Sequence, residues 1–204
     1  MSFSEAKKLA TPKKPTEAFA EIAKKHFLHT HYFQAPGVAE AELGGQPREF
    51  LRRIYWALSA KGSLLDWSKH SSEGTGYLDV LAEPSESFPW SWLSEEDFEY
   101  YVTEYMREQG DAMFVGGLNS YRNADRNWEI AQAHRDKRID VPALFISGVR
   151  DPVMKIASAD SLERMRKLVP NLRGIHLIPN AGHFVMQEQP DAVNYALLSF
   201  LRNL

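Results

Sequence analysis

Hydrophobic positions in the last third of the chain follow two alternating patterns. "VPALFISG" (141–148) is a continuous apolar run between a proline and a glycine, which suits a strand covered on both faces. "SADSLERMRKLVP" (158–170) then has helical spacing, and "RGIHLIP" (173–179) is a second short apolar run. "QPDAVNYALLSFLRNL" (189–204) closes the chain as an amphipathic helix. This β-α-β-α order predicts an α/β fold with a parallel sheet. The apolar stripe of the last helix comprises Val193, Ala196, Leu197, Phe200, Leu201 and Leu204.

The pattern from residue 16 to about residue 128 is helical but irregular, because it is rich in aromatic residues and broken by prolines. The clearest helix lies in "SEEDFEYYVTEYMREQG" (94–110). Ser94 is a good N-cap, acidic residues fill the first turn, and Gly110 is expected to end the helix. The residues before 16 are polar, contain two prolines and are expected to form a loose leader.

Two strands are too few for an independent parallel sheet, which needs both faces covered and its edges protected. We therefore expect the last third to be the end of a larger sheet. In that case the edge of the first strand and the inner face of the helical region expose apolar area, which favours association.

The composition of the chain makes several classes of function unexpected, among them nucleic-acid binding, membrane binding and cysteine chemistry. The formal net charge of −3 gives no broad cationic field, so neither nucleic acid nor an anionic membrane is expected as a partner. The absence of cysteine excludes disulfides, thiolate nucleophiles and zinc–thiolate sites, and it fits a cytoplasmic location. No apolar run approaches the roughly 20 residues of a membrane span, and no apolar segment follows the N-terminal lysines as in a secretory signal. No cofactor or metal is expected, because a glycine-rich phosphate loop and metal-ligand spacing are both missing.

Two polar residues follow the predicted strands directly, Asp151 after the first and His183 after the second. Reactive groups collect beyond the carboxyl ends of parallel strands, which lie only about 4.8 Å apart, so these side chains can meet. A carboxylate that accepts the imidazole N–H leaves the other ring nitrogen free as a general base. The alternative is a turn aspartate and a loop histidine with no shared role. The other six histidines have no convergent partner, and most of them are expected at the surface or in packing: His26, His29, His31, His70, His134 and His176.

Four segments together resemble the epoxide hydrolases of the α/β-hydrolase superfamily. "VPALFISGVRDPV" and "NAGHFVMQEQPDAVNYALLSFL" resemble the end of the core and are moderately specific, whereas "YFQAPGVAEAEL" and "GGLNSYRNADRNWE" resemble the helical lid and are more specific. The resemblance runs from about Pro15 to the C-terminus. It implies a partial α/β-hydrolase fold, with a leader (1–15), a helical lid (16–138) and the C-terminal part of the core (139–204).

The resemblance also implies a mechanism. In the family an aspartate opens the epoxide to form an ester, a histidine–acid pair activates water to hydrolyse the ester, and two lid tyrosines protonate the epoxide oxygen. His183 and Asp151 match the pair, and Tyr121 matches one lid tyrosine. The second tyrosine position is His29, whose imidazole either replaces the phenol, as a neutral donor or as an imidazolium acid, or marks an altered activity. His29 and Tyr32, the nearest phenol although at another family position, are the predicted substrate-binding residues.

One expected part has no match. The sequence contains no Gly-x-Ser-x-Gly and no glycine-flanked aspartate between a strand and a helix, so the nucleophile is missing and the isolated chain is expected to be inactive. Three explanations stay open: a truncated or clipped gene, a separate chain that carries the N-terminal half, or a non-catalytic homo-oligomer. A related hydrolase of carbon–halogen bonds is a further alternative, because tryptophan N–H groups can bind halide. The lid tyrosine argues against it. The available indoles are Trp56, Trp67, Trp90, Trp92 and Trp128.

Overall fold

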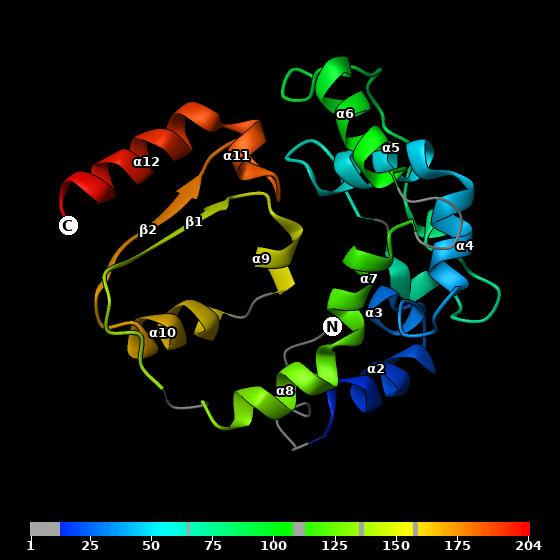
Figure 1. The fold of residues 1–204 in the computed structure, drawn as a ribbon, viewed down its shortest axis with the longest axis horizontal. Coiled ribbons are helices and arrows are strands. Elements are labelled where there is room, and N and C mark those ends of the chain that lie inside the picture. The colour runs from blue at the N-terminus through cyan, green and yellow to red at the C-terminus, as the bar shows by residue number, and fades with distance from the viewer. Residues whose placement is uncertain (1–12, 65, 108–112, 135–136, 157–158) are drawn as a thin grey trace.

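The computed structural model describes residues 13–64, 66–107, 113–134, 137–156 and 159–204, and these form two groups of elements (Figure 1). The first group is helical. It contains α2 (Pro15–Ala23), α3 (His29–Tyr32), α4 (Val38–Gly45), α5 (Pro47–Leu58), the 3-10 helices η1 (Trp67–Lys69) and η2 (Leu78–Val80), α6 (Glu95–Tyr105), α7 (Val115–Arg122) and α8 (Ala124–Gln132). The second contains β1 (Ala143–Gly148), α9 (Pro152–Ile156), α10 (Ala159–Leu168), β2 (Leu172–Ile178), α11 (Val185–Glu188) and α12 (Pro190–Arg202).

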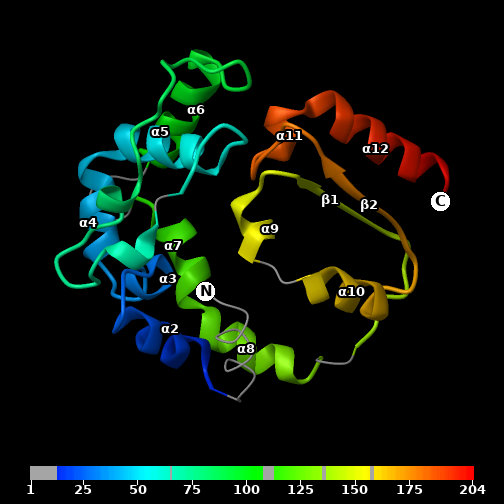
Figure 2. The same ribbon diagram turned by 180° about the vertical axis from the view of Figure 1, so that it is seen from behind.

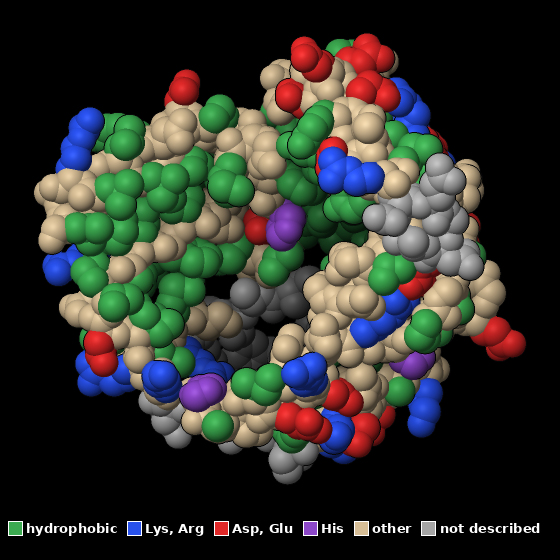
Figure 3. All heavy atoms as spheres, viewed as in Figure 1, with side chains coloured by type: hydrophobic (Ala, Val, Ile, Leu, Met, Phe, Trp, Pro, Cys, Tyr) green, Lys and Arg blue, Asp and Glu red, His purple; other side chains and the backbone are tan. Residues whose placement is uncertain are grey.

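The two groups are joined through α8 and also meet where α5 and α6 approach α11 (Figures 1 and 2). Between these two junctions the space-filling view shows an opening in the centre of the molecule (Figure 3). Most of the predicted leader lies outside the described residues, and the first helix begins at Pro15, a residue suited to the first turn.

Local sequence signals account for several helix boundaries. The Ser94 hydroxyl accepts a hydrogen bond from the Asp97 N–H at 3.1 Å, which confirms the predicted N-cap of α6. This helix ends at Tyr105, and the predicted terminator Gly110 lies outside the described residues. Pro47 and Pro190 occupy the first turns of α5 and α12, where their missing N–H costs no hydrogen bond.

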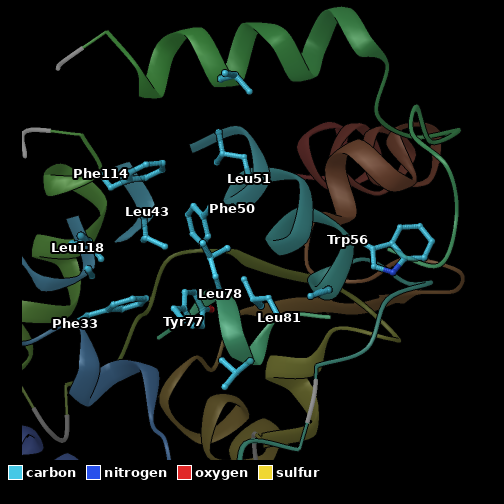
Figure 4. Close-up of a cluster of buried hydrophobic side chains, with 14 of the residues drawn as sticks. Phe33, Leu43, Phe50, Leu51, Trp56, Tyr77, Leu78, Leu81, Phe114 and Leu118 are labelled. Atoms are coloured by element: carbon cyan, nitrogen blue, oxygen red, sulfur yellow. The ribbon is translucent and has the colours of Figure 1, made fainter. Parts of the chain in front are cut away.

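A buried apolar cluster holds the helical group together, and aromatic rings make up much of it (Figure 4). Phe27, Leu43 and Phe98 are each only 1% exposed. Full burial of such side chains stabilises by about 1.5–3 kcal/mol each. The irregular helices of this region therefore share one core, which explains why they fold without the regular amphipathic stripe of a long helix.

The sheet confirms the predicted parallel pairing. β1 and β2 lie side by side in register from Leu144 opposite Gly174 to Gly148 opposite Ile178. α10 provides the connection between them, as the β-α-β-α pattern predicted. The carboxyl ends of both strands consequently lie at the same edge of the sheet.

The coverage of this sheet differs from the prediction that 141–148 is buried on both faces. Most of β1 is only partly buried, and Val141, just before it, is 65% exposed. On α12 the residues Val193 and Ala196 are buried, but the rest of the predicted stripe is not. Leu197, Leu201 and Leu204 are 40%, 57% and 69% exposed. Two strands offer too little surface to cover the stripe. The exposure predicted at the edge of the first strand and on the inner face of the helical region concerns other surfaces and stays a prediction.

Two short helices, α9 and α11, stand where the sequence predicted loops. Each follows directly on a candidate site residue or its neighbour, so both determine how the strand ends are shaped. In the part of the chain that the structure describes, no helix has the length and apolar character needed to cross a bilayer.

Candidate functional site

The carboxylate of Asp151 and the imidazole of His183 meet at the carboxyl ends of β1 and β2. His183 Nδ1 lies 3.3 Å from both Asp151 Oδ1 and Oδ2. The Asp151 residue is buried, whereas the His183 side chain is 43% exposed. With Nδ1 turned toward the carboxylate, Nε2 is the ring nitrogen available as a base. The predicted proximity of the two residues is thus confirmed.

Local hydrogen bonds fix the Asp151 carboxylate. Its Oδ1 accepts the Val153 N–H at 2.8 Å, and the Ser147 hydroxyl, on β1, lies 3.4 Å from Oδ2. The Asp151 N–H in turn donates to the Gly148 carbonyl at 3.2 Å. The turn from β1 into α9 therefore sets the direction of the carboxylate toward His183.

The two strand-end loops are bound to each other through their backbones. The Val149 N–H donates to the Ile178 carbonyl and the Arg150 N–H to the Ala181 carbonyl, both at 2.9 Å. Gly148 is needed at this point, because a Cβ there would lie 2.2 Å from the Gly182 carbonyl oxygen. This close approach keeps Asp151 and His183 within reach of one another.

The His183 loop also lies against the helical group. The His183 N–H donates to the Leu58 carbonyl at the end of α5, at 2.9 Å. The neighbouring Phe184 ring lies 4.6 Å from the Tyr55 ring and 5.9 Å from the Trp92 ring, measured between centroids. The candidate base is therefore held at the boundary between the two groups of elements.

Tyr121, on the last turn of α7, forms a second cluster with His29 of α3. Their ring centroids are 5.7 Å apart, and the Tyr121 ring also lies 5.0 Å from the Phe33 ring. Partial burial raises the pKa of Tyr121, so its phenol stays protonated and able to donate at neutral pH. Its residue exposure of 38% leaves it accessible from outside.

Arg122 holds α7 against the segment between α3 and α4. Its guanidinium donates to both oxygens of Glu40, at 2.5 and 2.9 Å, and to the Phe33 carbonyl at 2.9 Å. Glu40 is only 3% exposed, and its hydrogen bond with Arg122 lowers the pKa of the carboxyl group. This buried ion pair, which was not predicted from the sequence, connects "YFQAPGVAEAEL" with "LNSYRN". The pattern of charged residues alone gives no signal for it.

His29 is enclosed by aromatic rings. Its ring centroid lies 4.8 Å from that of Trp67 and 6.0 Å from that of Tyr77. Nδ1 is buried without a hydrogen-bond partner in the described structure, and burial lowers the pKa of His29 to about 4. Burial therefore favours the neutral imidazole at pH 7, and the part that His29 plays in place of a second lid tyrosine stays a prediction.

Tyr32 uses its hydroxyl inside the helical group. The hydroxyl donates to Glu42 Oε2 at 2.7 Å, and burial together with this hydrogen bond raises the pKa of the phenol. Glu42 also accepts the N–H groups of Tyr77 and Leu78, at 2.9 and 3.0 Å. Tyr32 thus connects α3 with the start of η2, and its predicted contact with substrate stays a prediction.

Four of the five predicted site residues form two pairs on different parts of the fold, and Tyr32 belongs to neither pair. Asp151 and His183 stand at the strand ends, and His29 and Tyr121 stand on α3 and α7. Within the described ranges no hydrogen bond or ring contact joins one pair to the other. Among the same residues, no group of three or more histidine, aspartate or glutamate side chains is arranged to hold a metal ion.

Similar proteins agree on one family. The chain is 39% identical to Epoxide hydrolase A of Mycobacterium tuberculosis over 191 residues, which is 93% of the chain. It is 32% identical to Bifunctional epoxide hydrolase 2 of Rattus norvegicus over 86% of the chain. Epoxide Hydrolase A of Mycobacterium thermoresistibile superposes with a TM-score of 0.77 at 38% identity, and an epoxide hydrolase from an endophytic Streptomyces with 0.79 at 33%. No family model matches the chain.

The superpositions cover 94% of the chain and 57% of the Mycobacterium thermoresistibile protein, and 93% of the chain and 56% of the Streptomyces protein. The chain likewise spans 56% of the length of the Mycobacterium tuberculosis protein and 30% of the rat protein. The structure and these relatives together confirm a partial α/β-hydrolase fold. The chain belongs to the epoxide hydrolase family of the α/β-hydrolase superfamily.

Proposed function

We propose that this chain contributes the water-activating half of an active site that hydrolyses an epoxide to a vicinal diol. The observation that carries the proposal is the contact between His183 Nδ1 and both Asp151 oxygens at the carboxyl ends of two parallel strands. The relatives named as epoxide hydrolases support the same reaction for this family member. The substrate is a small-molecule epoxide, and no cofactor takes part.

The proposed reaction has two steps. A carboxylate attacks an epoxide carbon, the ring C–O bond breaks, and the oxygen receives a proton from a lid donor, which gives a hydroxyalkyl ester. His183 Nε2 then takes a proton from water while the resulting hydroxide attacks the ester carbonyl. The ester C–O bond breaks, the proton of the added hydroxyl passes to the leaving oxygen, and the diol leaves the restored carboxylate. The imidazolium proton returns through water to the lid donor, which restores both groups. Asp151 stabilises the imidazolium that forms and keeps Nδ1–H in place.

Tyr121 is the proposed proton donor to the epoxide oxygen, and His29 is the second hydrogen-bond donor beside it. The raised pKa of Tyr121 keeps the phenol protonated in the resting state. The neutral His29 is suited to stabilise the developing alkoxide through an N–H, but not to protonate it at pH 7. This division makes Tyr121 the acid and His29 a donor.

We propose that the ester-forming aspartate comes from a polypeptide segment outside these 204 residues. The central opening and the apolar side chains gathered around it support a missing α/β partner (Figure 3). Val149, Val153 and Leu177, near the strand ends, are 53%, 50% and 44% exposed. In this division residues 16–138 act as the lid and residues 139–204 as the last part of the core.

Two alternatives lead to different outcomes. A non-catalytic subunit or homo-oligomer would use the same apolar face for self-association and show no turnover with any partner. A carbon–halogen hydrolase would need free indole N–H groups. Those of Trp67 and Trp90 approach the Val80 and Glu86 carbonyls at 3.3 and 3.4 Å, whereas Trp92 Nε1 is buried without a hydrogen-bond partner in the described structure. The donors beside Tyr121 fit an oxygen better than a halide.

The proposal is tested by joining the chain to the N-terminal half of an epoxide hydrolase relative and measuring diol formation from an aromatic and an aliphatic epoxide. We expect turnover by the joined protein and none by the 204-residue chain alone. Asp151→Asn, which keeps the shape of the side chain, should lower kcat by at least about 100-fold. A well-folded joined protein that converts no epoxide would refute the proposed function.

A further inference from the structure

The carboxylate of Glu188 joins two parts of the chain that are far apart in sequence. Glu188, the last residue of α11, is only 8% exposed. Its Oε1 accepts the N–H of Gly182 at 2.9 Å, and its Oε2 accepts the N–H of Ala60 at 2.7 Å. Gly182 precedes His183, and Ala60 follows the end of α5, so one side chain connects the His183 loop to the helical lid.

A carboxylate is suited to this position for a chemical reason. When ionised it only accepts hydrogen bonds, so each oxygen can face a backbone N–H. In the isosteric amide one oxygen becomes an NH2 group, which would point a donor at a donor. Leaving a buried N–H without a partner costs more than the hydrogen bond itself gains.

Other contacts show how closely the two segments approach. The His183 N–H donates to the Leu58 carbonyl at 2.9 Å. A Cβ on Gly182 would lie only 2.5 Å from that carbonyl oxygen and 2.6 Å from the Ala60 nitrogen. The turn after α5 therefore rests directly on the backbone that carries the imidazole, and in both ribbon views it approaches α11 (Figures 1 and 2).

We propose that Glu188 is a positioning residue, which aligns His183 with the lid by binding the Ala60 and Gly182 N–H groups at once. The His183 backbone then cannot turn independently of α5, and Nδ1 stays directed at Asp151 while Nε2 stays free. The consequence for catalysis rests on the proposed function, because the direction of the imidazole matters only if it acts as a base.

The experiment uses the 204-residue chain, because the measurement does not require enzymatic turnover. Long-range ¹H–¹⁵N NMR spectra of the imidazoles report which nitrogen of His183 carries the proton. In the native chain we expect one tautomer, with Nδ1–H and an unprotonated Nε2. Glu188→Gln should give a mixture of tautomers and about tenfold faster hydrogen exchange at Gly182 and Ala60. Glu163→Gln, which removes an exposed carboxylate on α10, should match the native chain in both measurements.

A second variant separates positioning from folding. Glu188→Asp keeps the charge but is one methylene shorter, so it can reach only one of the two N–H groups and should also mix the tautomers. A folded Gln or Asp variant with the native His183 tautomer would overturn the proposal, and so would a loss of thermal stability without any change at His183. An inactive joined protein, by contrast, would refute the proposed function and leave these spectra unaffected.

Discussion

His29 is a single residue whose burial is expected to make stability depend on pH. In the unfolded chain this imidazole has its ordinary pKa of 6.5, whereas burial lowers the pKa in the folded chain to about 4. Between these values the unfolded state binds more protons, so the folded state loses stability as the pH falls. The aromatic rings of Phe33, Trp67, Tyr77 and Tyr121 around it offer no charge that would compensate for protonation.

We therefore predict that the free energy of unfolding decreases by about 2 kcal/mol from His29 alone between pH 7 and pH 5. His29→Phe should remove this part of the pH dependence, while His134→Phe, at an exposed position, should keep it. Urea unfolding at both pH values measures the difference. An equal pH dependence in the native chain and in His29→Phe would show that His29 is not desolvated.

Gly182 is a second residue with a steric role, because the backbone after α5 leaves no room for a side chain at this position. Gly182→Ala should destabilise the fold by about 1–3 kcal/mol, because the added Cβ would meet backbone atoms of Leu58, Ser59 and Ala60 within 2.6 Å. The matched control is Gly45→Ala at the end of α4, where nothing lies within 4 Å of the new Cβ. This control should be neutral or slightly stabilising. Thermal melting that ranks the two variants in the opposite order would contradict the described contact.

The position of a site residue was predictable where the neighbouring sequence carries a signal. Asp151 and His183 follow strand-like runs, and their meeting follows from parallel pairing. Glu188 and Arg122 were not predictable as linkers, because their partners at Ala60 and Glu40 are 128 and 82 residues away. The rings that enclose His29 come from several elements, so the sequence left open whether this residue is packed or at the surface.

Among the elements, α7 must be held in place if Tyr121 is to act as the proposed proton donor. The ion pair between Arg122 and Glu40 does this at a buried position, with 15% and 3% of the side chains exposed. Breaking a buried pair by removing one partner leaves the other charge uncompensated, which costs more than the pair contributes when intact.

Arg122→Met should accordingly lower the free energy of unfolding by about 3 kcal/mol. Adding Glu40→Gln to the same protein should recover about 1 kcal/mol, because the orphaned buried charge is then gone. Lys14→Met is the control, since its ion pair with Glu129 is about half exposed, and its loss should change the free energy of unfolding little. Additive effects of the two buried substitutions in a double-mutant cycle would argue against this coupling.

The sequence predicted helices and strands whose apolar pattern extends over at least six residues. The strands at Ala143–Gly148 and Leu172–Ile178 and the helices α6, α10 and α12 lie within one or two residues of their predicted starts. The four- and five-residue helices α11 and α9 are too short to show a period, so the sequence predicts loops in their place. Part of the α12 stripe is exposed because the described sheet has too few strands to cover it. The local sequence pattern of α12 does not show whether a covering element is present.

The whole molecule exposes a face that a complete core would cover. Leu198 and Leu201 on α12 are 51% and 57% exposed, and the β1–β2 sheet lacks further strands in the described structure. Such surfaces mark sites of association.

We predict that the isolated chain self-associates in a concentration-dependent way, as measured by sedimentation velocity. Leu198→Glu with Leu201→Glu should shift the population toward monomer. Ile130→Glu, at a 54% exposed position on α8 in the lid, should leave the association unchanged. A monomeric native chain at all concentrations would contradict this use of the α12 face.

In the proposed reaction His183, oriented by Asp151, hydrolyses an ester that the nucleophile has already formed. The most direct test is intact-protein mass spectrometry of the joined protein during exposure to epoxide, with and without His183→Gln. We expect the His183→Gln protein to accumulate an adduct of one epoxide mass per chain. The joined protein with the native His183 should turn over and accumulate little adduct. Undiminished diol formation by His183→Gln, or a folded variant that forms no adduct at all, would contradict the account.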